Sequence, residues 1–221
     1  MTKFKKAIIV ANNQQSPISD LETIFESNDL LIAADGGANY LANSQFTPDI
    51  LIGDLDSIDK KILASLISKG TEILSYPTQK DKTDLDLAIQ HAISYKVKNI
   101  IILSALGKRW DHTIANIMLI GSKQYALTDV EINIIDDQQQ IHVMNAKKNY
   151  TIEGTPGNTV SLIPITKSVK GITTSGLEYK LTNDTIFFGT TLGISNSFIS
   201  HSASITFDKG QLICIVIRKT I

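Results

Sequence analysis

The stretch DILIGDLDSIDKKILASLISKGTEILSY (residues 49–76) predicts a strand, a helix and a second strand in succession. Residues 49–53 are a continuous apolar run, which is typical of a buried strand of a parallel sheet. Residues 59–70 carry apolar side chains at helical spacing and end at a glycine, a common helix stop. Residues 71–76 are a further short β-like run. We therefore expect one strand–helix–strand unit here.

The same alternation extends over about the first 135 residues. It is typical of a parallel sheet that helices cover on both faces. In such sheets, ligands bind beyond the carboxyl ends of the strands, and this chain places its polar, glycine-containing loops there. Further strands are expected at 5–11, 29–34, 99–106 and 131–137, and further helices at 18–27, 38–44, 84–95 and 112–125.

From about residue 138 the chain changes to short β-like segments separated by Gly, Pro, Asn and Asp. No long helical period remains, so an antiparallel sandwich or barrel is expected. EYKL (178–181) is one of the predicted strands, and TFDKGQLICI (206–215) is expected to close this domain as a hairpin.

The composition is that of an ordinary globular protein. Of its 221 residues, 43% are hydrophobic and 19% are charged, with a formal net charge of −1. This balance argues against a protein that binds nucleic acid through bulk charge. The single cysteine, Cys214, permits no internal disulfide and fits a reducing compartment. No apolar run approaches the length of a membrane span, so we expect a cytoplasmic protein without membrane or nucleic-acid partners.

Two carboxylates, Asp54 and Asp56, follow the strand at 49–53 with a single leucine between them. Like charges this close repel, and a hard divalent cation such as Mg²⁺ would relieve the repulsion and bring phosphate with it. Asp81 and Asp84 lie in the next polar loop and helix start. The alternative for these two acids is structural, because acids at a helix start stabilise its dipole and form capping boxes.

Two other loops could bind phosphate. Gly36 and Gly37 allow a tight turn that exposes backbone N–H groups, although a plain turn explains such a pair equally well. Arg109 could clamp a phosphate, or it could lie in a surface turn with Asp111 capping the next helix. No phosphate-binding loop of the G-x-x-x-x-G-K-[ST] type is present. Acidic loops, glycine turns and an arginine together point to nucleotide-dependent phosphoryl-type transfer.

Six stretches, taken in order, resemble the thiamine pyrophosphokinase family. They are ADGGAN (34–39), IGDLDSI (52–58), QKDKTDLDLAI (79–89), LGKRWDHTIAN (106–116), GLEYKL (176–181) and LGISNSF (192–198). The resemblance implies an α/β fold, with a Rossmann-like parallel ATP-binding domain over residues 1–138 and an antiparallel β-sandwich thiamine-binding domain over 139–221. It implies a homodimer with active sites between subunits, and transfer of the pyrophosphoryl group of ATP to the hydroxyl of thiamine, giving thiamine diphosphate and AMP.

The resemblance also implies roles for individual residues. The catalytic residues would be Asp54, Asp56, Asp84 and Arg109, and the first three of these would hold Mg²⁺. ATP would be bound by Asp35, Gly36, Gln79, Asp81 and Arg109, and thiamine by Asp111, Ser195, Asn196 and Phe198. The chain departs from the family at Lys108, where a second glycine is usual, and at Ile194, where a small polar residue is common.

Two other functions are open at this point. One is a pyrophosphokinase that acts on another hydroxymethyl heterocycle, such as a hydroxymethylpterin; LGISNSF in a β-domain favours thiamine. The other is a non-catalytic nucleotide or thiamine sensor, which would not require so many carboxylates facing a triphosphate.

Overall fold

The computed structural model describes residues 4–13 and 19–218, and these divide into two compact units. The first contains the residues up to Ile120 together with Leu127–Asp137, and the second contains Gly121–Ala126 and the residues from Gln138 onward. Within the described residues, no helix is both long enough and apolar enough to cross a membrane.

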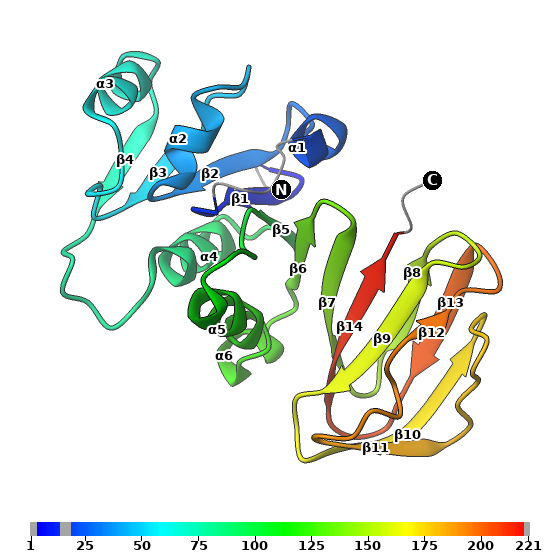
Figure 1. The fold of residues 1–221 in the computed structure, drawn as a ribbon. Coiled ribbons are helices and arrows are strands. Elements are labelled where there is room, and N and C mark those ends of the chain that lie inside the picture. The colour runs from blue at the N-terminus through cyan, green and yellow to red at the C-terminus, as the bar shows by residue number, and fades with distance from the viewer. Residues whose placement is uncertain (1–3, 14–18, 219–221) are drawn as a thin grey trace. The chain divides into compact units, whose positions relative to one another are not determined.

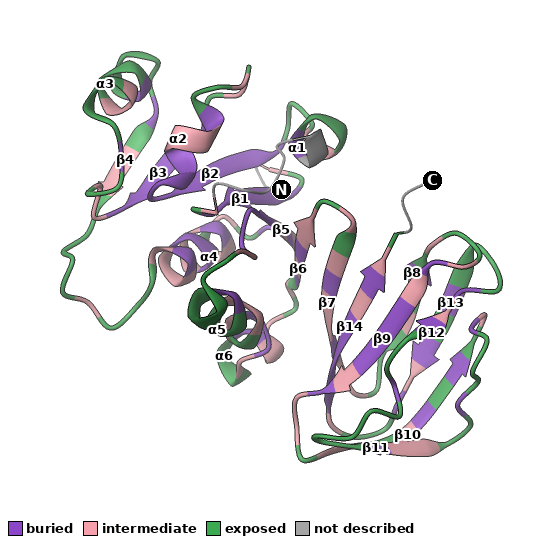
Figure 2. Cartoon of the chain, viewed as in Figure 1, coloured by how far each residue is buried: buried purple, intermediate pink, exposed green. Residues whose placement is uncertain are grey.

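The first unit contains six parallel strands in the order β6-β5-β1-β2-β3-β4 (Figure 1). The strands β1, β2 and β3 are buried along their whole lengths (Figure 2), because they lie in the middle of the sheet and helices cover both of its faces. The bounds are β1 Ala7–Val10, β2 Leu30–Ala34, β3 Ile50–Gly53, β4 Glu72–Ser75, β5 Asn99–Leu103 and β6 Glu131–Asp136.

Figure 1 shows α1, α2 and α3 on one side of this sheet and α4 and α5 on the other. Asp59 caps α3 by accepting hydrogen bonds from two backbone N–H groups of its first turn, and Gly70, at a positive φ of 89°, follows its end. Thr83 caps α4 by accepting the N–H of Asp86 at 3.2 Å. The bounds are α1 Ser19–Ile24, α2 Gly37–Leu41, α3 Lys60–Ser68, α4 Asp84–Ser94 and α5 Trp110–Ile120.

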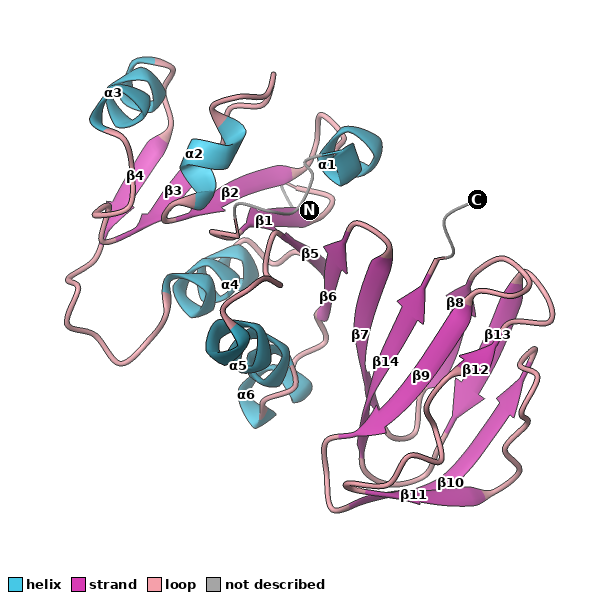
Figure 3. Ribbon diagram, viewed as in Figure 1, coloured by secondary structure: helices cyan, strands magenta, loops and turns pink. Residues whose placement is uncertain are grey.

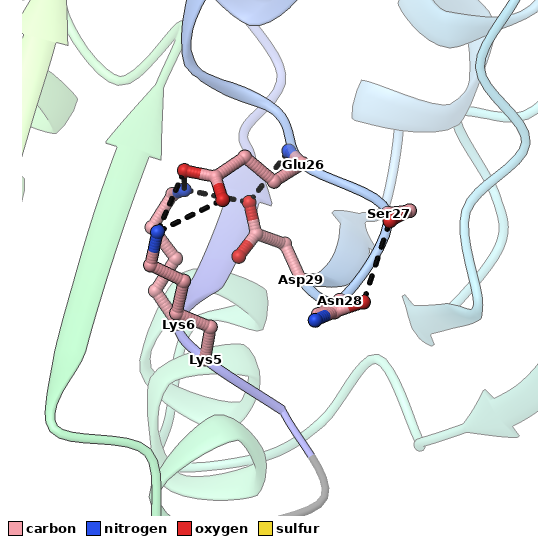
Figure 4. Close-up of polar contacts among 6 residues, drawn as sticks. All are labelled: Lys5, Lys6, Glu26, Ser27, Asn28 and Asp29. Carbon is pink, nitrogen blue, oxygen red and sulfur yellow. Dashed lines mark hydrogen bonds and ion pairs between the residues drawn. The ribbon is translucent and has the colours of Figure 1, made fainter.

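A group of charged side chains holds the amino ends of β1 and β2 together (Figure 4). Lys6 Nζ lies 2.7 Å from Asp29 Oδ2, and the Asp29 side chain is fully buried. The same Asp29 oxygen accepts the backbone N–H of Glu26 at 2.8 Å. Lys5 pairs with the exposed Glu26 carboxylate at 2.8 Å. The buried pair therefore fixes the start of β2, whose other end leads into the polar loops.

The second unit has two antiparallel sheets (Figure 3). One has the order β12-β9-β14-β7 and the other β11-β10-β13-β8. Apolar side chains from both sheets, including Phe198 and Cys214, form one buried core, as expected for a sandwich. The bounds are β7 Gln139–Asn145, β8 Asn149–Glu153, β9 Thr159–Pro164, β10 Ser168–Ser175, β11 Asp184–Phe187, β12 Asn196–Ser197, β13 Ser202–Thr206 and β14 Gln211–Ile217, with the short helix α6 at Lys123–Ala126.

The predicted fold class, an α/β domain followed by an antiparallel β-sandwich, is confirmed, but three local predictions are wrong. The helix expected at 112–125 is interrupted at Gly121. Residues 178–181 form no strand. The segment 206–215 is not a hairpin, because β13 pairs with β8 and β10 whereas β14 pairs with β7 and β9. The turn between β13 and β14 carries the chain from one sheet to the other.

Candidate active site

Three carboxylates converge at the carboxyl edge of the first unit's sheet. Asp35 follows β2, Asp54 follows β3, and Asp84 begins α4. One oxygen from each lies within 4.8 Å of the others. Strands β2 and β3 are parallel neighbours, so the residues after them meet at the same edge, and the N–H of Asp35 donates to Ile52 O at 2.7 Å. We call Asp35, Asp54 and Asp84 the acidic cluster.

The turn after β3 separates Asp54 from Asp56. Leu55 adopts a positive φ of 67° and packs against the apolar core. The N–H of Asp56 donates to Asp54 Oδ1 at 3.2 Å, while the Asp56 side chain is exposed and accepts a hydrogen bond from Ser57 Oγ at 2.9 Å. The turn therefore directs Asp54 into the acidic cluster and leaves the Asp56 carboxylate outside it.

The acidic cluster is electrostatically unbalanced. Burial raises the pKa of the Asp84 carboxyl above its ordinary value; the ammonium of Lys80 acts in the opposite direction, and the charges of Asp35 and Asp54 add to the increase. The pKa of Asp54 is lowered, chiefly because its carboxylate accepts the N–H of Asp56, with Lys80 contributing. The two shifts differ in sign because Asp54 has a backbone donor, whereas burial dominates at Asp84.

The acidic cluster fits a hard divalent cation. Asp35 is only 8% exposed, and its Oδ1 has no hydrogen-bond partner among the residues that the structure describes. Buried carboxylate oxygens are normally satisfied by a donor or a metal. Three convergent carboxylates with such an oxygen are suitable ligands for Mg²⁺, which prefers oxygen donors.

A cavity of about 410 Å³ opens beside the acidic cluster. Its walls come from the residues that follow β1, the end of β2, the start of α4 and the loop after β5. Strand β1 pairs with β2 on one side and β5 on the other, so the strand order reverses at this point. In open α/β sheets, ligands bind at such a switch point. The cavity lining includes Asp35, Asp84, Lys108 and Arg109.

Three side chains brace the loop after β5, residues 104–107. Asn116 donates to Ala105 O at 2.8 Å. The Thr113 hydroxyl both accepts the N–H of Gly107 and donates to its carbonyl, at 2.9 and 3.1 Å. Asn13 donates to the Leu106 carbonyl. These contacts fix one wall of the cavity and the backbone that leads to Arg109.

Arg109 and Asp111 form an exposed, two-point ion pair at the start of α5. The guanidinium donates from Nε at 3.1 Å and from one terminal nitrogen at 2.5 Å. This pairing lowers the pKa of Asp111 to about 2. Both side chains are more than half exposed, so the pair contributes little to stability and both groups can reach a ligand.

Comparison with known proteins gives two matches that together span most of the chain. The family model described as "Thiamin pyrophosphokinase, catalytic domain" matches residues 21–135, and the one described as "Thiamin pyrophosphokinase, vitamin B1 binding domain" matches residues 133–212. The chain belongs to the thiamine pyrophosphokinase family.

Individual members of the family match over nearly their whole lengths. Thiamine pyrophosphokinase of Bacillus subtilis (strain 168) is 34% identical over 215 residues, which is 96% of this chain and 98% of that protein. Thiamine pyrophosphokinase 1 of Arabidopsis thaliana is 28% identical over 243 residues, 99% and 89% of the two chains. The crystal structure of the Bacillus subtilis protein superposes with a TM-score of 0.86 at 30% identity, covering 98% of this chain and 100% of that one.

The remaining residues that the family resemblance singled out in the first unit lie near the acidic cluster without joining it. Gly36 is buried and stands next to the side chain of Asn12. Gln79 and Asp81 are exposed on the loop before α4. Lys108 is exposed beside Arg109. Of these four residues, only Lys108 lines the cavity.

The predicted thiamine-binding residues of the second unit differ strongly in exposure. Ser195 is exposed at a positive φ of 59°, and its N–H donates to Ser161 Oγ at 3.1 Å. Asn196 is buried and holds the backbone of Tyr179 by accepting from its N–H at 2.9 Å and donating to its carbonyl at 2.7 Å. Phe198 is 2% exposed and lies in the core. Only Ser195 of the three presents a free surface.

Sequence reasoning missed Lys80 and the bracing residues. Lys80 Nζ lies 3.1 Å from Asp84 Oδ1 and 3.7 Å from Asp54 Oδ2. Lys80 lies in the loop before α4, so the spacing rule for charged pairs within a helix does not apply to Lys80 and Asp84, and the sequence gives no signal for this contact. Thr113 and Asn116 bond backbone groups six and eleven residues earlier, and Asn13 bonds one that lies 93 residues away. The sequence does not show how the loop folds back to meet these side chains.

Proposed function

We propose that this enzyme transfers the pyrophosphoryl group of ATP to the hydroxyl of thiamine, giving thiamine diphosphate and AMP. The observation that carries the proposal is the acidic cluster beside a cavity at the switch point of the sheet, in a chain of the thiamine pyrophosphokinase family. Three convergent carboxylates beside one cavity suit a site that receives a metal-bound triphosphate, and a plain binding pocket has no need of them.

Asp54 and Asp84, with Asp35, would hold Mg²⁺. When bound, the metal would offset negative charge on the ATP phosphates. Asp56 orients Asp54 through its N–H and remains a predicted ligand on the same turn. The pKa of Asp54 is lowered, so its carboxylate stays ionised, which favours its role as a metal ligand.

The residues around the cavity would position ATP for in-line attack. The thiamine hydroxyl oxygen bonds to the β-phosphorus and its proton is released to solvent, while the bond from that phosphorus to the α–β bridging oxygen breaks and AMP leaves. Such transfers depend mainly on positioning and charge stabilisation. Arg109 would stabilise charge on the transferred group, and Gly36, Gln79 and Asp81 would contact the nucleotide.

Thiamine would contact Asp111 and the turn at Ser195. Asp111 stays ionised at neutral pH because of its low pKa, so it can accept a hydrogen bond from an amino group of the ligand. Asn196 and Phe198 belong to the thiamine site in this proposal; Asn196 holds the backbone of Tyr179, and Phe198 lies in the core.

A homodimer with active sites at the subunit interface is part of the proposal. Large apolar side chains are exposed on both units, as expected where another surface covers them. In the first unit they are Trp110, Ile114 and Met118 on α5, and in the second Phe187, Phe188, Leu192 and Ile199. Light scattering on the purified protein tests the oligomeric state. A cytoplasmic location, which the single cysteine fits, also stays a prediction.

Incubation with ATP, Mg²⁺ and thiamine, followed by chromatography of the products, tests the reaction. AMP with thiamine diphosphate supports the proposal. ADP with thiamine monophosphate would mean a simple kinase, AMP release only with a hydroxymethylpterin would mean a pterin enzyme, and binding without products would mean a sensor.

Asp54→Asn tests the acidic cluster directly. An asparagine keeps the acceptor for the Asp56 N–H but removes the charge, so the fold should persist while turnover falls by orders of magnitude. Glu22→Gln, which removes an exposed charge on α1, is the matched control and should be fully active. Near-normal turnover of Asp54→Asn at saturating Mg²⁺ would refute the metal role.

A further inference from the structure

Lys80 is the most buried side chain of an otherwise exposed loop. The loop joins β4 to α4 and comprises residues 76–83. Its other residues are exposed, whereas the Lys80 side chain is only 14% exposed. A long charged side chain normally keeps its ammonium in water unless partners replace the water. The position of Lys80 therefore needs partners that offset its desolvation.

Those partners belong to the acidic cluster. Lys80 Nζ lies 3.1 Å from Asp84 Oδ1 and 3.7 Å from Asp54 Oδ2, and it donates to Pro77 O at 3.1 Å. The ammonium thus reaches two of the three clustered carboxylates and one loop carbonyl. It offsets the repulsion between carboxylates that meet at close range.

A divalent cation needs the same oxygens. Mg²⁺ binds carboxylates at about 2.1 Å, so it competes with the Lys80 ammonium for Asp84 Oδ1 and Asp54 Oδ2. A lysine charge near a divalent ion is also strongly repelled in a partly buried site. Asp35 Oδ1 has no donor among the described residues and is not in contact with Lys80. It can therefore bind the incoming metal ion before Lys80 is displaced.

We propose that Lys80 is an internal cation that holds the acidic cluster together until the divalent metal binds, and that metal binding expels it and releases the loop 76–83. The inference rests on the proposed metal site. Gln79 and Asp81 flank Lys80, so the position of these two predicted nucleotide contacts depends on whether the lysine is docked. Metal affinity and loop position are then reciprocally coupled.

The first test measures Mn²⁺ binding without nucleotide, by the electron paramagnetic resonance signal of the free ion. Lys80→Met keeps the length of the side chain and removes the competitor, so Mn²⁺ should bind roughly tenfold tighter, which corresponds to about 1.4 kcal/mol. Lys80→Arg keeps the charge and should not bind tighter than the native chain. Lys82→Met is the matched control: Lys82 is exposed in the same loop and donates to Gln90 at 2.6 Å, away from the acidic cluster.

The outcomes distinguish failure of the Lys80 role from failure of the proposed reaction. Equal or weaker Mn²⁺ binding by Lys80→Met than by the native chain overturns the role of Lys80 and leaves the proposed reaction intact. If neither binds Mn²⁺, even with ATP present, the proposed metal site is wrong and the inference falls with it. Tighter binding that Lys82→Met reproduces would reflect general charge and would also overturn the inference.

A second test uses the native protein, so it does not depend on any variant folding. Trypsin cleaves after accessible lysines, and Lys80 and Lys82 offer two sites in one loop. Without metal, cleavage after Lys82 should predominate, because Lys80 is docked. Mg²⁺ should raise the proportion of cleavage after Lys80, measured by mass spectrometry. A proportion that Mg²⁺ leaves unchanged contradicts release of the loop.

Discussion

Replacement of Asp29 by alanine should destabilise the first unit without impairing its chemistry. The Asp29 side chain is fully buried and its Oδ2 receives both Lys6 Nζ, at 2.7 Å, and the N–H of Glu26, at 2.8 Å (Figure 4). Asp29→Ala leaves a lysine that is only 11% exposed without its main counter-ion, and it leaves a backbone donor unsatisfied.

The structure bounds the size of this loss. Removing one partner of a buried ion pair costs about 3 to 5 kcal/mol. Lys6 retains a weaker contact with Glu26 at 3.5 Å, so the lower end of that range, about 3 kcal/mol, is expected. For a urea m-value of about 2 kcal/mol per molar, the unfolding midpoint should fall by roughly 1.5 M. Asp29→Asn retains the acceptor for Glu26 and should lose less.

Urea unfolding followed by circular dichroism measures the loss, and hydrogen exchange of peptides from β1 and β2 assigns it to the first unit. Glu26→Gln is the matched control: it removes the exposed pair with Lys5 and should leave the midpoint unchanged within error. At low temperature, the folded Asp29→Ala variant should release AMP at the native rate. A midpoint within experimental error of the native value would refute the assignment of Asp29 as a buried, stabilising charge.

Three further predictions concern single sites. Asn116→Ala removes a brace of the loop after β5, so the KM for ATP should rise several-fold in assays of AMP release; an unchanged KM contradicts this. Arg109 lowers the pKa of Asp111 to about 2, so the stability that this pair contributes is present above the ordinary pKa of 3.8 and is lost as pH falls toward 2. In an NMR titration, Arg109→Gln should raise the pKa of Asp111 toward 3.8. Gly154→Ala places a methyl carbon 2.5 Å from the Phe198 ring and should cost about 2 kcal/mol in thermal unfolding, which added Phe198→Leu should partly restore.

Most strands and helices of the first unit were predictable because the residue pattern that marks each one lies within the element itself. The bounds of the apolar runs that predicted β1 to β4 lie within two residues of the observed strand bounds. Strand partners in the second unit were not predictable in the same way. The residues of β13 and β14 each predict a strand, yet the short turn at 207–210 joins two sheets, and no feature of those residues selects that course over a hairpin.

For the acidic residues too, some positions were predictable from local sequence and others depend on contacts between elements. Position after a strand end correctly brings Asp54 to the carboxyl edge of the sheet, and position at a helix start brings Asp84 there. The pattern does not show that Leu55 packs on the core at a positive φ, an uncommon conformation for leucine, and so turns Asp56 outward. Nor does it show that Asp35 supplies the third oxygen, because that depends on the register between β2 and β3.

The two ends of the first unit's sheet differ in charge balance, because the amino ends carry a stabilising ion pair whereas the carboxyl ends carry the proposed reaction site. At the amino ends of β1 and β2, the buried Asp29 meets a lysine, and the pair stabilises the register. At the carboxyl ends, three acids meet one lysine, so burial and mutual repulsion raise the pKa of Asp84, and Asp35 keeps an oxygen without a donor among the described residues. An excess of two negative charges is unfavourable for the isolated fold and favourable for a divalent cation. Mg²⁺ should therefore raise the unfolding temperature of the native chain but leave that of Asp54→Asn nearly unchanged, because ligand-linked stability needs the ligand's site to be intact.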